Sequence, residues 1–409
     1  SVTDTTVRNL SGGSVTYTAT VDPDNLIPET NEGNNEKSST SKTVLYNGYK
    51  GARYWEGKSD VLTTRTFDLL GGLLFSPGDS TYRAGGVGGS GWSSYTVTWT
   101  GSDLPLPAGA TVREARLYVP YTWDDSQQVP DHFHLAFNGN QMAPDALYTD
   151  QSNFGGYANH RYGLLAYNVT QWFNPAGNTA LLTKDNVNTN LAMYGLTLAV
   201  VYEDPSSTRK QVFLNEGFDI LGADETQYGT TPGEATAYLP FSGMTTSPGD
   251  AAHASLTTFV PSGNGPEGDL LWNEVTIGTN VWDYGPSTGT QVAVDTRDVK
   301  SSLLASGNEA GIRSTATGAT PLMAASHAFL VVEYSGTGPV ADFAANVTFG
   351  PAPLTVGFTD QSSGTITAYA WDFQDDGTID STEKDPVYTY PSQGTYTVNL
   401  TVTGPAGSA

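Results

Sequence analysis

An acidic stretch near the C-terminus has the composition and spacing of a calcium-binding loop. In such a loop, oxygen ligands fall at positions 1, 3, 5, 7, 9 and 12, with a backbone carbonyl at position 7. The corresponding residues are Asp372, Gln374, Asp376, Thr378, Asp380 and Glu383. Gly377 is at the sharp turn, whereas Gln374 departs from the usual Asp or Asn and would weaken affinity. The alternatives are a calcium site, with calcium as the only cofactor that we expect, and a solvated acidic hairpin without an ion.

Two histidines form a weaker candidate site. His132 and His134 are two residues apart on an expected strand, so both face the same side, next to Asp131. They could supply part of a zinc site. Because the sequence contains five histidines and shows no clear third ligand, we favour a structural or surface role.

Four Asn-x-Ser/Thr sequons could carry N-linked glycans. Their asparagines are Asn9, Asn168, Asn346 and Asn399. Asn399 lies on the threonine-bearing face of an expected strand, from which a glycan could project. Chance also produces sequons in a threonine-rich chain, so both occupied and empty sites remain open.

The sequence gives no positive indication of catalysis. It contains no Gly-x-Ser-x-Gly nucleophile elbow, and sequence cannot show which of its 42 acidic residues face one another. We therefore expect that the protein is not an enzyme. Exposed aromatic side chains could instead bind sugars, and the alternative is that they belong to the core. The candidates are Trp123, Trp172, Trp272 and Trp282.

Residue alternation indicates strands throughout the chain. Near the C-terminus, Tyr396, Val398, Leu400 and Val402 alternate with polar residues, which is the period of a half-buried strand. This region resembles the PKD module, an immunoglobulin-like β-sandwich of surface layers, adhesins and secreted hydrolases. The resemblance rests on residues 339–343 (PVADF), 352–360 (APLTVGFTD), 371–373 (WDF), 388–390 (YTY) and 394–402 (GTYTVNLTV). It implies an extracellular location and a β-sandwich.

The N-terminal region shows a second resemblance. Residues 21–36 (VDPDNLIPETNEGNNE) resemble the closing motif of the CARDB domain, a cell-adhesion-related β-sandwich. Only the last part of that domain is expected here. The same acidic turn is a weaker calcium candidate, and we favour Asx-type hydrogen bonds that tighten it.

The middle of the chain contains an expected internal duplication. Three pairs of blocks occur in the same order. These are residues 115–121 with 235–241, Asn168 and 177–180 with Asp298 and 307–310, and Val200-Val201 with Val331-Val332. The first pair predicts that Tyr118 and Tyr238 are equivalent. Each copy is expected to contain one short helix, with Val169, Trp172 and Phe173 on one face in the first copy.

These elements predict an all-β, multidomain protein. We expect two jelly-roll or β-sandwich lobes and a C-terminal immunoglobulin-like PKD sandwich. The expected divisions are a partial CARDB-like segment (1–44), a first lobe (45–224), a second lobe (225–335) and the PKD domain (339–409). The order of these parts resembles uncharacterised surface proteins of methanogenic archaea, which implies an archaeal cell-surface protein.

Composition restricts the partners and the location. The 409 residues contain 18 Lys and Arg against 42 Asp and Glu, a net charge of −24, which disfavours nucleic acid and anionic lipid. Cysteine is absent, so disulfides cannot contribute. No apolar run approaches about 18 residues, so no membrane insertion is expected. No signal peptide heads the sequence, and Ser1 is expected to be a processed end or the start of an excised fragment.

Two functional hypotheses follow. The first is an extracellular structural or adhesive subunit of a filament, sheath or surface layer, which polymerises with itself or other surface proteins through β-strand edges. Residues 1–42 are expected to be completed by strands from another copy or, alternatively, to pack on the chain's own middle region. The second hypothesis is a secreted carbohydrate-binding or carbohydrate-degrading surface protein, with glycans as partners.

Overall fold

The structure is a computed structural model, which describes most of the chain in segments. These are residues 13–15, 18–20, 36–38, 42–44, 47–54, 59–85, 91–125, 127–152, 160–185, 190–244, 248–285, 289–315, 322–334, 339–404 and 407–408. No helix in these segments is long and apolar enough to cross a membrane.

Eighteen strands build the middle region. The first ten are β5 (Leu62–Ser76), β6 (Ser94–Thr100), β7 (Thr111–Asp124), β8 (Phe133–Phe137), β9 (Asn140–Met142), β10 (Ala146–Gln151), β11 (Arg161–Asn168), β12 (Gly177–Lys184), β13 (Ala192–Met193) and β14 (Thr197–Glu203). The other eight are β15 (Arg209–Gly222), β16 (Thr236–Phe241), β17 (Ala251–Pro261), β18 (Glu267–Trp272), β19 (Val275–Trp282), β20 (Val292–Asp298), β21 (Asn308–Arg313) and β22 (Leu322–Tyr334).

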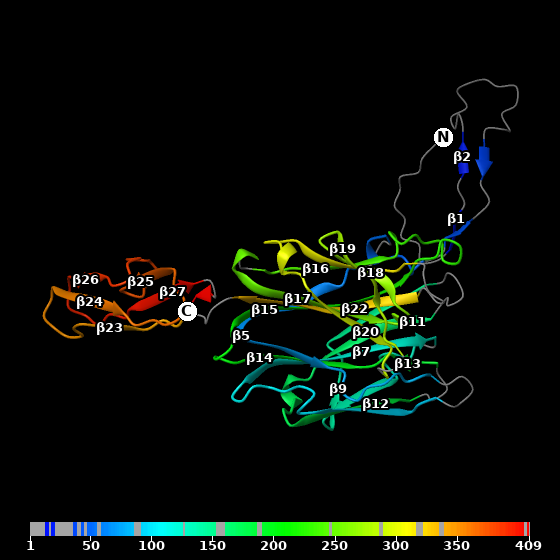
Figure 1. Ribbon diagram of the computed structural model, residues 1–409, viewed down its shortest axis with the longest axis horizontal. Coiled ribbons are helices and arrows are strands. Elements are labelled where there is room, and N and C mark those ends of the chain that lie inside the picture. The colour runs from blue at the N-terminus through cyan, green and yellow to red at the C-terminus, as the bar shows by residue number, and fades with distance from the viewer. Residues whose placement is uncertain are drawn as a thin grey trace, which may run out of the picture.

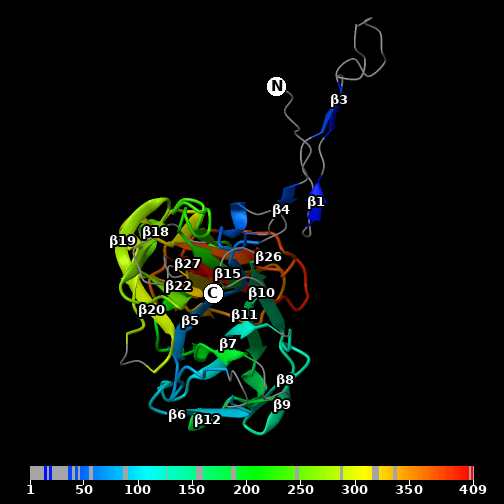
Figure 2. The same ribbon diagram turned by 90° about the vertical axis from the view of Figure 1, so that its right-hand side faces the viewer.

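These strands form one long sheet covered by two smaller ones. The ten-stranded sheet has the order β10-β11-β7-β14-β5-β15-β22-β17-β20, with β13 paired to β7. Two four-stranded sheets have the orders β6-β12-β8-β9 and β16-β21-β18-β19. Figures 1 and 2 show the first small sheet at the bottom of the molecule and the second at the top, with the long sheet between them. The expected all-β, multidomain fold is therefore confirmed.

The strand order repeats along the chain. In the first half, the sheets β11-β7-β14-β5 and β6-β12-β8-β9 face each other. In the second half, β20-β17-β22-β15 and β16-β21-β18-β19 occupy the same places in the same chain order. The two counterparts β5 and β15 pair antiparallel, with Leu70 opposite Arg209 and Leu62 opposite Glu216, and so join the halves. This order assigns β15 to the second half, whereas the sequence-based boundary after residue 224 places it in the first.

Two of the sequence-based equivalences need correction. Tyr118 lies on β7, whose counterpart is β17, while Tyr238 lies on β16, so these tyrosines are not equivalent. In the registers, Val200 pairs with Ala115 and Val332 pairs with Ala254. Val200 therefore corresponds to Val332, one residue from the match made on sequence. Short apolar strings resemble one another by chance, whereas strand pairing fixes the alignment.

An asparagine motif repeats almost atom for atom in the two halves. Asn138 donates from Nδ2 to Trp172 O (2.7 Å) and accepts from Thr179 N (2.8 Å). Its counterpart Asn273 donates to Ser302 O (2.8 Å) and accepts from Glu309 N (2.9 Å). Both asparagines have left-handed backbone conformations, with φ of 48° and 50°.

The two segments that were expected to form short helices each form a single 3₁₀ turn instead. These are η3 (Thr170–Trp172) and η5 (Lys300–Ser302), while η2 (Ala52–Tyr54) and η4 (Pro248–Asp250) lie elsewhere. The expected helical face was wrong in one respect, because Val169 is buried but Trp172 is 38% exposed. A 3₁₀ turn closes after three residues, so the side chains do not form one helical face.

We predict that Asn138→Ala and Asn273→Ala each lower the free energy of unfolding by about 2 kcal/mol. Alanine loses three side-chain hydrogen bonds at each position and is strained at positive φ. Asn138→Gly and Asn273→Gly are the controls, because they keep the backbone conformation and lose only the hydrogen bonds. Urea denaturation should show similar losses of unfolding free energy for the two alanine variants. A loss for only one of them would contradict the structural equivalence of the two positions.

Three apolar cores hold the middle region together. The first lies inside the first half, around Trp99 and Leu117, and the second inside the second half, around Leu239 and Trp272. The third packs the two halves against each other through β7, β11, β15 and β22, around Tyr118, Leu164 and Phe329. Because alternate residues of β7 point into different cores, this strand connects a half's interior with the junction between halves.

The C-terminal domain has its own core. It consists of two three-stranded sheets, β23-β24-β26 and β25-β27-β28. Their strands are β23 (Phe343–Ala345), β24 (Leu354–Asp360), β25 (Ala368–Asp372), β26 (Val387–Tyr390), β27 (Asn399–Gly404) and β28 (Gly407–Ser408). Trp371 is fully buried between Phe343 and Phe358. The expected strand begins only at Asn399, but the predicted alternation holds within it, since Val402 is buried and Asn399 exposed.

Four short strands precede the middle region. β1 (Gly13–Val15) pairs with β4 (Lys42–Val44), and β2 (Thr18–Thr20) pairs with β3 (Glu36–Ser38). Apart from Glu36, the acidic turn at residues 22–36 lies outside the described residues. In Figure 1 the labelled strands β1 and β2 lie at the opposite end of the molecule from the C-terminal domain.

Candidate functional site

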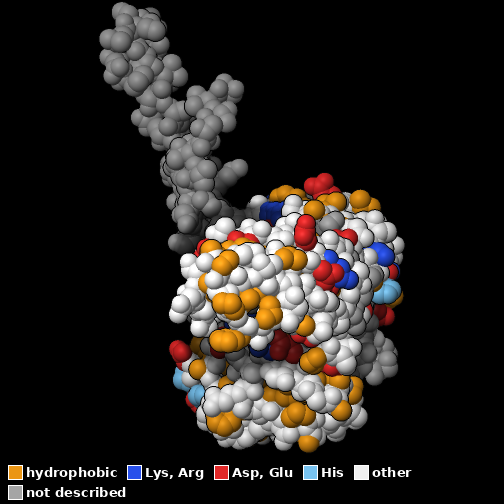
Figure 3. Space-filling view, turned by 90° about the vertical axis from the view of Figure 1, so that its left-hand side faces the viewer, with side chains coloured by type: hydrophobic (Ala, Val, Ile, Leu, Met, Phe, Trp, Pro, Cys, Tyr) orange, Lys and Arg blue, Asp and Glu red, His pale blue; other side chains and the backbone are white. Residues whose placement is uncertain are grey.

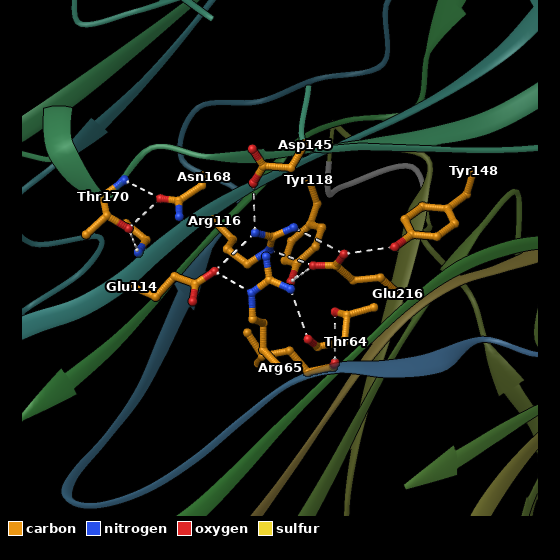
Figure 4. A network of polar contacts seen from close by, with 12 residues as sticks. Thr64, Arg65, Glu114, Arg116, Tyr118, Asp145, Tyr148, Asn168, Thr170 and Glu216 are labelled. Carbon is orange, nitrogen blue, oxygen red and sulfur yellow. Dashed lines mark hydrogen bonds and ion pairs between the residues drawn. The ribbon is translucent and has the colours of Figure 1, made fainter. Parts of the chain in front are cut away.

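The junction of the two halves contains a buried ion pair. Arg116 on β7 and Glu216 on β15 are 1% and 2% exposed. Arg116 Nε donates to Glu216 Oε1 (2.6 Å) and Nη2 donates to Oε2 (3.1 Å), a bidentate geometry. Figure 4 shows the two side chains reaching toward each other across the junction. One residue comes from each half, so the pair fixes the halves relative to each other.

Further polar groups complete this cluster. Tyr118 Oη and Tyr148 Oη each donate to Glu216 at 3.1 Å. Arg116 Nη1 also donates to Glu114 Oε1 and Asp145 Oδ2, both at 3.1 Å. We call these residues, together with Arg65, which donates to Glu114 at 3.1 Å, the junction cluster. The side chains of Arg65 and Asp145 are 38% and 39% exposed, so the cluster extends from the interior to solvent.

Electrostatics indicate a structural role for this cluster. Burial lowers the pKa of Arg116, but Tyr118, Glu216 and Glu114 raise it more, so the net pKa lies above its usual value. Burial raises the pKa of the Tyr118 phenol well above its usual range. Both oxygens of Glu216 already accept hydrogen bonds, so no lone pair faces an open space where a substrate could bind. These contacts connect residues of the two halves.

A buried histidine is stacked beside this cluster. The His327 ring lies between Tyr118 (centroids 4.4 Å apart) and Phe259 (4.0 Å) in nearly parallel planes. Its Nδ1 is 2.9 Å from Ser326 Oγ, and its Nε2 has no hydrogen-bond partner among the described residues. Burial lowers the pKa of His327 to about 3, so the ring is neutral at ordinary pH.

A pocket of about 230 Å³ also opens at the junction of the two halves. Aromatic, hydroxyl and amide side chains form its lining. The lining residues are Tyr82, Thr122, Trp123, Tyr162, Tyr194, Ser262, Gln291 and Leu322. Five of them come from the first half and three from the second, so the pocket exists only when the halves are packed together.

Sequence reasoning missed both junction features. A signal for the cluster was present, because Arg116 directly precedes the apolar residues 117–121 of β7, and Glu216 lies shortly after the apolar residues 212–214 of β15. Charged residues in such strands need partners when buried. The pairing itself joins residues 100 positions apart, which no local pattern shows.

One acid outside the junction is strongly perturbed. Glu267 is 1% exposed, and burial raises the pKa of its carboxyl to about 7. The hydrogen bond from Asn264 N (2.9 Å) lowers that pKa, while the negative charge of Asp283 raises it. Ionised Glu267 is therefore disfavoured in the folded protein.

We predict that Glu267→Gln stabilises the protein at pH 8 by about 3 kcal/mol. The folded-state pKa is raised above the usual 4.5, so the wild type loses stability as pH rises from 4.5 to about 7. Gln keeps the hydrogen-bond acceptor and removes the charge. The check is urea denaturation at pH 5 and pH 8, and an equal difference between variant and wild type at both pH values would contradict the prediction.

The predicted calcium loop forms a hydrogen-bonded turn in the C-terminal domain. The Asp372 carboxylate accepts from Gln374 N (3.1 Å), Asp376 N (3.2 Å) and Gly377 N (2.8 Å). Burial raises the pKa of Asp372, but the hydrogen bonds from these backbone N–H groups lower it by more. The net shift of this pKa is therefore downward. Asp380 accepts from Phe373 N (2.8 Å). No group of three metal-ligating side chains is found among the described residues.

Calcium binding by this loop stays a prediction, and the effect of calcium on the Tm tests it. If Asp372, Gln374, Asp376, Thr378, Asp380 and Glu383 hold the ion, calcium at 100 times its Kd adds about 2.7 kcal/mol of stability. Scanning calorimetry of the full chain should then show a higher Tm with calcium than with chelator. Asp376→Asn and Glu383→Gln should weaken this response. An unchanged Tm would show that the loop is an acidic turn that binds no calcium.

The two predicted histidine candidates share one carboxylate. His134 Nε2 is 3.0 Å from Asp185 Oδ1, and His132 Nδ1 is 3.4 Å from Asp185 Oδ2. The hydrogen bond from His134 lowers the pKa of Asp185. All three side chains are about half exposed, so they form a hydrogen-bonded group at the surface.

Three of the four predicted glycosylation asparagines lie in described, exposed loops or strands, and Asn9 lies outside the described residues. Asn168 Oδ1 accepts from Thr170 N (3.0 Å), and Asn346 Oδ1 accepts from Gly357 N (2.9 Å). Asn399 Nδ2, the atom to which a glycan attaches, donates to Asp375. Glycan occupancy stays a prediction.

The four candidate tryptophans differ in location and exposure. Trp272 and Trp282 are 1% and 0% exposed and belong to the core of the second half, so they cannot form an exposed binding surface. Trp172 is exposed on η3, and Trp123 lines the pocket at the junction.

Comparison with known proteins now identifies the chain's family. The family described as "Protein of unknown function (DUF3344)" matches residues 48–333, which cover the strands of the two halves except the last residue of β22. The chain belongs to the DUF3344 family. A PKD domain matches residues 337–409, and the CARDB family matches residues 1–39. PKD and CARDB domains are typical of extracellular or surface proteins. These matches do not support the archaeal origin that we expected from the sequence.

Likeness to solved structures is remote. PNGase F, a glycosylasparaginase from Flavobacterium meningosepticum, is 11% identical, covering 66% of this chain and 96% of its own with a TM-score of 0.19. A putative β-galactosidase from Bacteroides fragilis is 10% identical (80% and 41% covered, TM-score 0.17). The major capsid protein P2 of bacteriophage PM2 is 10% identical (62% and 96%, TM-score 0.18). Likeness at this level does not extend to activity. No curated protein matches the chain.

Proposed function

We propose that this DUF3344 protein is a structural or adhesive subunit of an extracellular surface assembly. The PKD and CARDB matches on either side of the DUF3344 region support a protein that works outside the cell. The junction cluster and the shared third core make the two halves one stiff unit between two β-modules. A stiff spacer with a module at each end is suited to linking surface components.

Capped edges restrict where such an assembly could form. On the outer edge of β6, Thr98 N donates to Asp79 Oδ1 (2.7 Å) and Thr98 O accepts from Asp79 N (3.1 Å). On the edge of β16, Tyr238 O accepts from Val61 N (3.1 Å), and Arg53 covers the Tyr238 ring at 3.9 Å. Covered edges cannot add a strand from another molecule.

The N-terminal strands carry the proposal, because among the described residues they belong to no larger sheet. In the part of the chain that the structure describes, β1–β4 pair only as two separate two-stranded ladders. Two-stranded ladders are marginal alone and gain stability from a third strand. A strand from another copy could supply it by β-augmentation, which gives an open, non-closing contact.

The test is electron microscopy of the full chain and of a chain lacking residues 1–44. We expect ordered polymers from the full chain and single particles after the deletion. A chain lacking residues 337–409 is the matched control, since it removes a module of similar kind at the other end. Polymers that form without residues 1–44 would rule out these strands as the contact, and single particles from the full chain would refute homopolymerisation.

A second candidate function, carbohydrate binding, is favoured by the junction pocket. Aromatic faces beside hydroxyl and amide groups suit a ligand with both apolar and hydrogen-bonding surfaces. Figure 3 shows acidic and basic side chains in small groups among hydrophobic ones on one face of the molecule. Isothermal titration with soluble glycans tests this candidate, and an absence of heat for all of them would exclude it.

A further inference from the structure

The lining of the junction pocket includes one pair of equivalent positions of the two halves. The carbonyls of Ala115 and Ala254 each accept a bond at 2.9 Å, from Val169 N and Val299 N, and mark corresponding points of β7 and β17. Trp123 and Ser262 follow these alanines at the same distance along the chain, and both line the pocket. Both have left-handed backbone conformations, with φ of 60° and 66°.

This conformation is unusual for both residues. Non-glycine residues at positive φ persist only where the surrounding structure holds them, and they concentrate at ligand sites. The Trp123 indole packs on the His160 ring at 4.7 Å and on Tyr162 at 6.4 Å, which fixes its orientation. The first half thus places a large aromatic face at the pocket, and the second places a small hydroxyl at the corresponding point.

The rest of the lining is polar but uncharged. The side chains of Tyr194, Thr122 and Ser262 contribute three hydroxyl groups to the lining. Gln291 adds an amide side chain, and its backbone connects to both halves through Tyr194 O (2.7 Å) and Ser262 N (2.9 Å). No Lys, Arg, Asp or Glu is among the described residues that line the pocket, although the chain carries 42 acids.

We infer that this pocket binds one neutral pyranose ring of a glycan, with its C–H face on the Trp123 indole. A pyranose offers one apolar face and several hydroxyls, which match an aromatic wall beside hydroxyl and amide groups. A volume of about 230 Å³ holds one such ring and no longer oligosaccharide. This inference rests on the second candidate function and specifies its site and ligand class.

Charged and fully apolar ligands fit this site less well. A uronate or phosphate group would lose its hydration without gaining a cation and would also meet the overall charge of −24. A purely apolar ligand would bury the hydroxyl groups of Tyr194, Thr122 and Ser262 without offering partners for hydrogen bonds.

The test is titration of the full chain with methyl hexopyranosides, followed by tryptophan fluorescence and calorimetry. We expect a Kd on the order of 1 mM for at least one neutral sugar, as for a small ligand held by one ring contact. Methyl glucuronide should bind at least about tenfold more weakly, because its charge is left without a partner.

Variants assign binding to the pocket. Trp123→Gly keeps the left-handed backbone without strain and removes the indole, so it should weaken binding about tenfold or more. Gln291→Ala should also weaken binding, and it tests the pocket independently if Trp123→Gly fails to fold. Trp172→Ala is the matched control, because Trp172 is exposed outside the pocket, and it should bind like the wild type.

The outcomes separate the two levels of the proposal. Neutral sugars that bind the wild type, Trp123→Gly and Gln291→Ala equally would refute the pocket while leaving carbohydrate binding in place. Preferential binding of the glucuronide would refute the ligand class. An absence of binding by every monosaccharide and by every soluble glycan would refute both, and the proposed role in assembly would be unaffected.

Discussion

Glu216→Gln is expected to lower the free energy of unfolding by about 3–5 kcal/mol, because the buried Arg116 charge loses its bidentate carboxylate and keeps only Glu114 and Asp145 at Nη1. The Arg116 guanidinium is 1% exposed and cannot turn to water for compensation. Tyr118 and Tyr148 would also lose a charged acceptor. Urea denaturation of the full chain, followed by tryptophan fluorescence, measures the change.

The matched control is an exposed pair on neighbouring strands. Arg113 and Glu203 are 3.4 Å apart with side chains 54% and 40% exposed. Glu203→Gln should therefore cost less than about 1 kcal/mol. The double variant Arg116→Met with Glu216→Leu should recover most of the stability lost in Glu216→Gln, since no buried charge remains. Similar losses for Glu203→Gln and Glu216→Gln would show that the junction cluster does not hold the halves together.

His327 is expected to make the protein labile to acid. Its pKa is about 3 in the folded protein and 6.5 when unfolded, so between these pH values only the unfolded chain takes up the proton. Stability from this residue is fully present above pH 6.5 and is lost as pH falls to about 3. At about 1.4 kcal/mol per pH unit, the loss reaches about 5 kcal/mol.

His327→Phe isolates this effect. Phenylalanine keeps the stack between Tyr118 and Phe259 but does not titrate. The difference in unfolding free energy between variant and wild type should shift in favour of the variant from pH 6.5 downward. Glu267 has the opposite pH dependence between pH 4.5 and 7, but it is present in both proteins and cancels in the difference. A difference that stays constant with pH would show that His327 is not buried as a neutral ring.

Local patterns determined the elements of this protein. Alternating residues such as those around Val402 predicted strands, since a period of two is visible in neighbouring residues. The WDF motif around Trp371 indicated the PKD module, and Trp371 is its core. The match of Asn168 and Gly177 with Asp298 and Gly307 indicated the duplication, because the 3₁₀ turn needs the same residue types in both copies.

Tertiary structure alone decided how these elements meet. The counterparts β5 and β15 pair, and this pairing brings Arg116 to Glu216 and Trp123 to Ser262. Such contacts join residues separated by about a hundred positions or more, and their energy depends on packing and desolvation rather than on neighbouring sequence. For the same reason the sequence aligned Tyr118 with Tyr238, whereas hydrogen bonding places them in different sheets. The strands of this DUF3344 protein were therefore readable in its sequence, while its junction cluster and its pocket exist only where the two halves pack together.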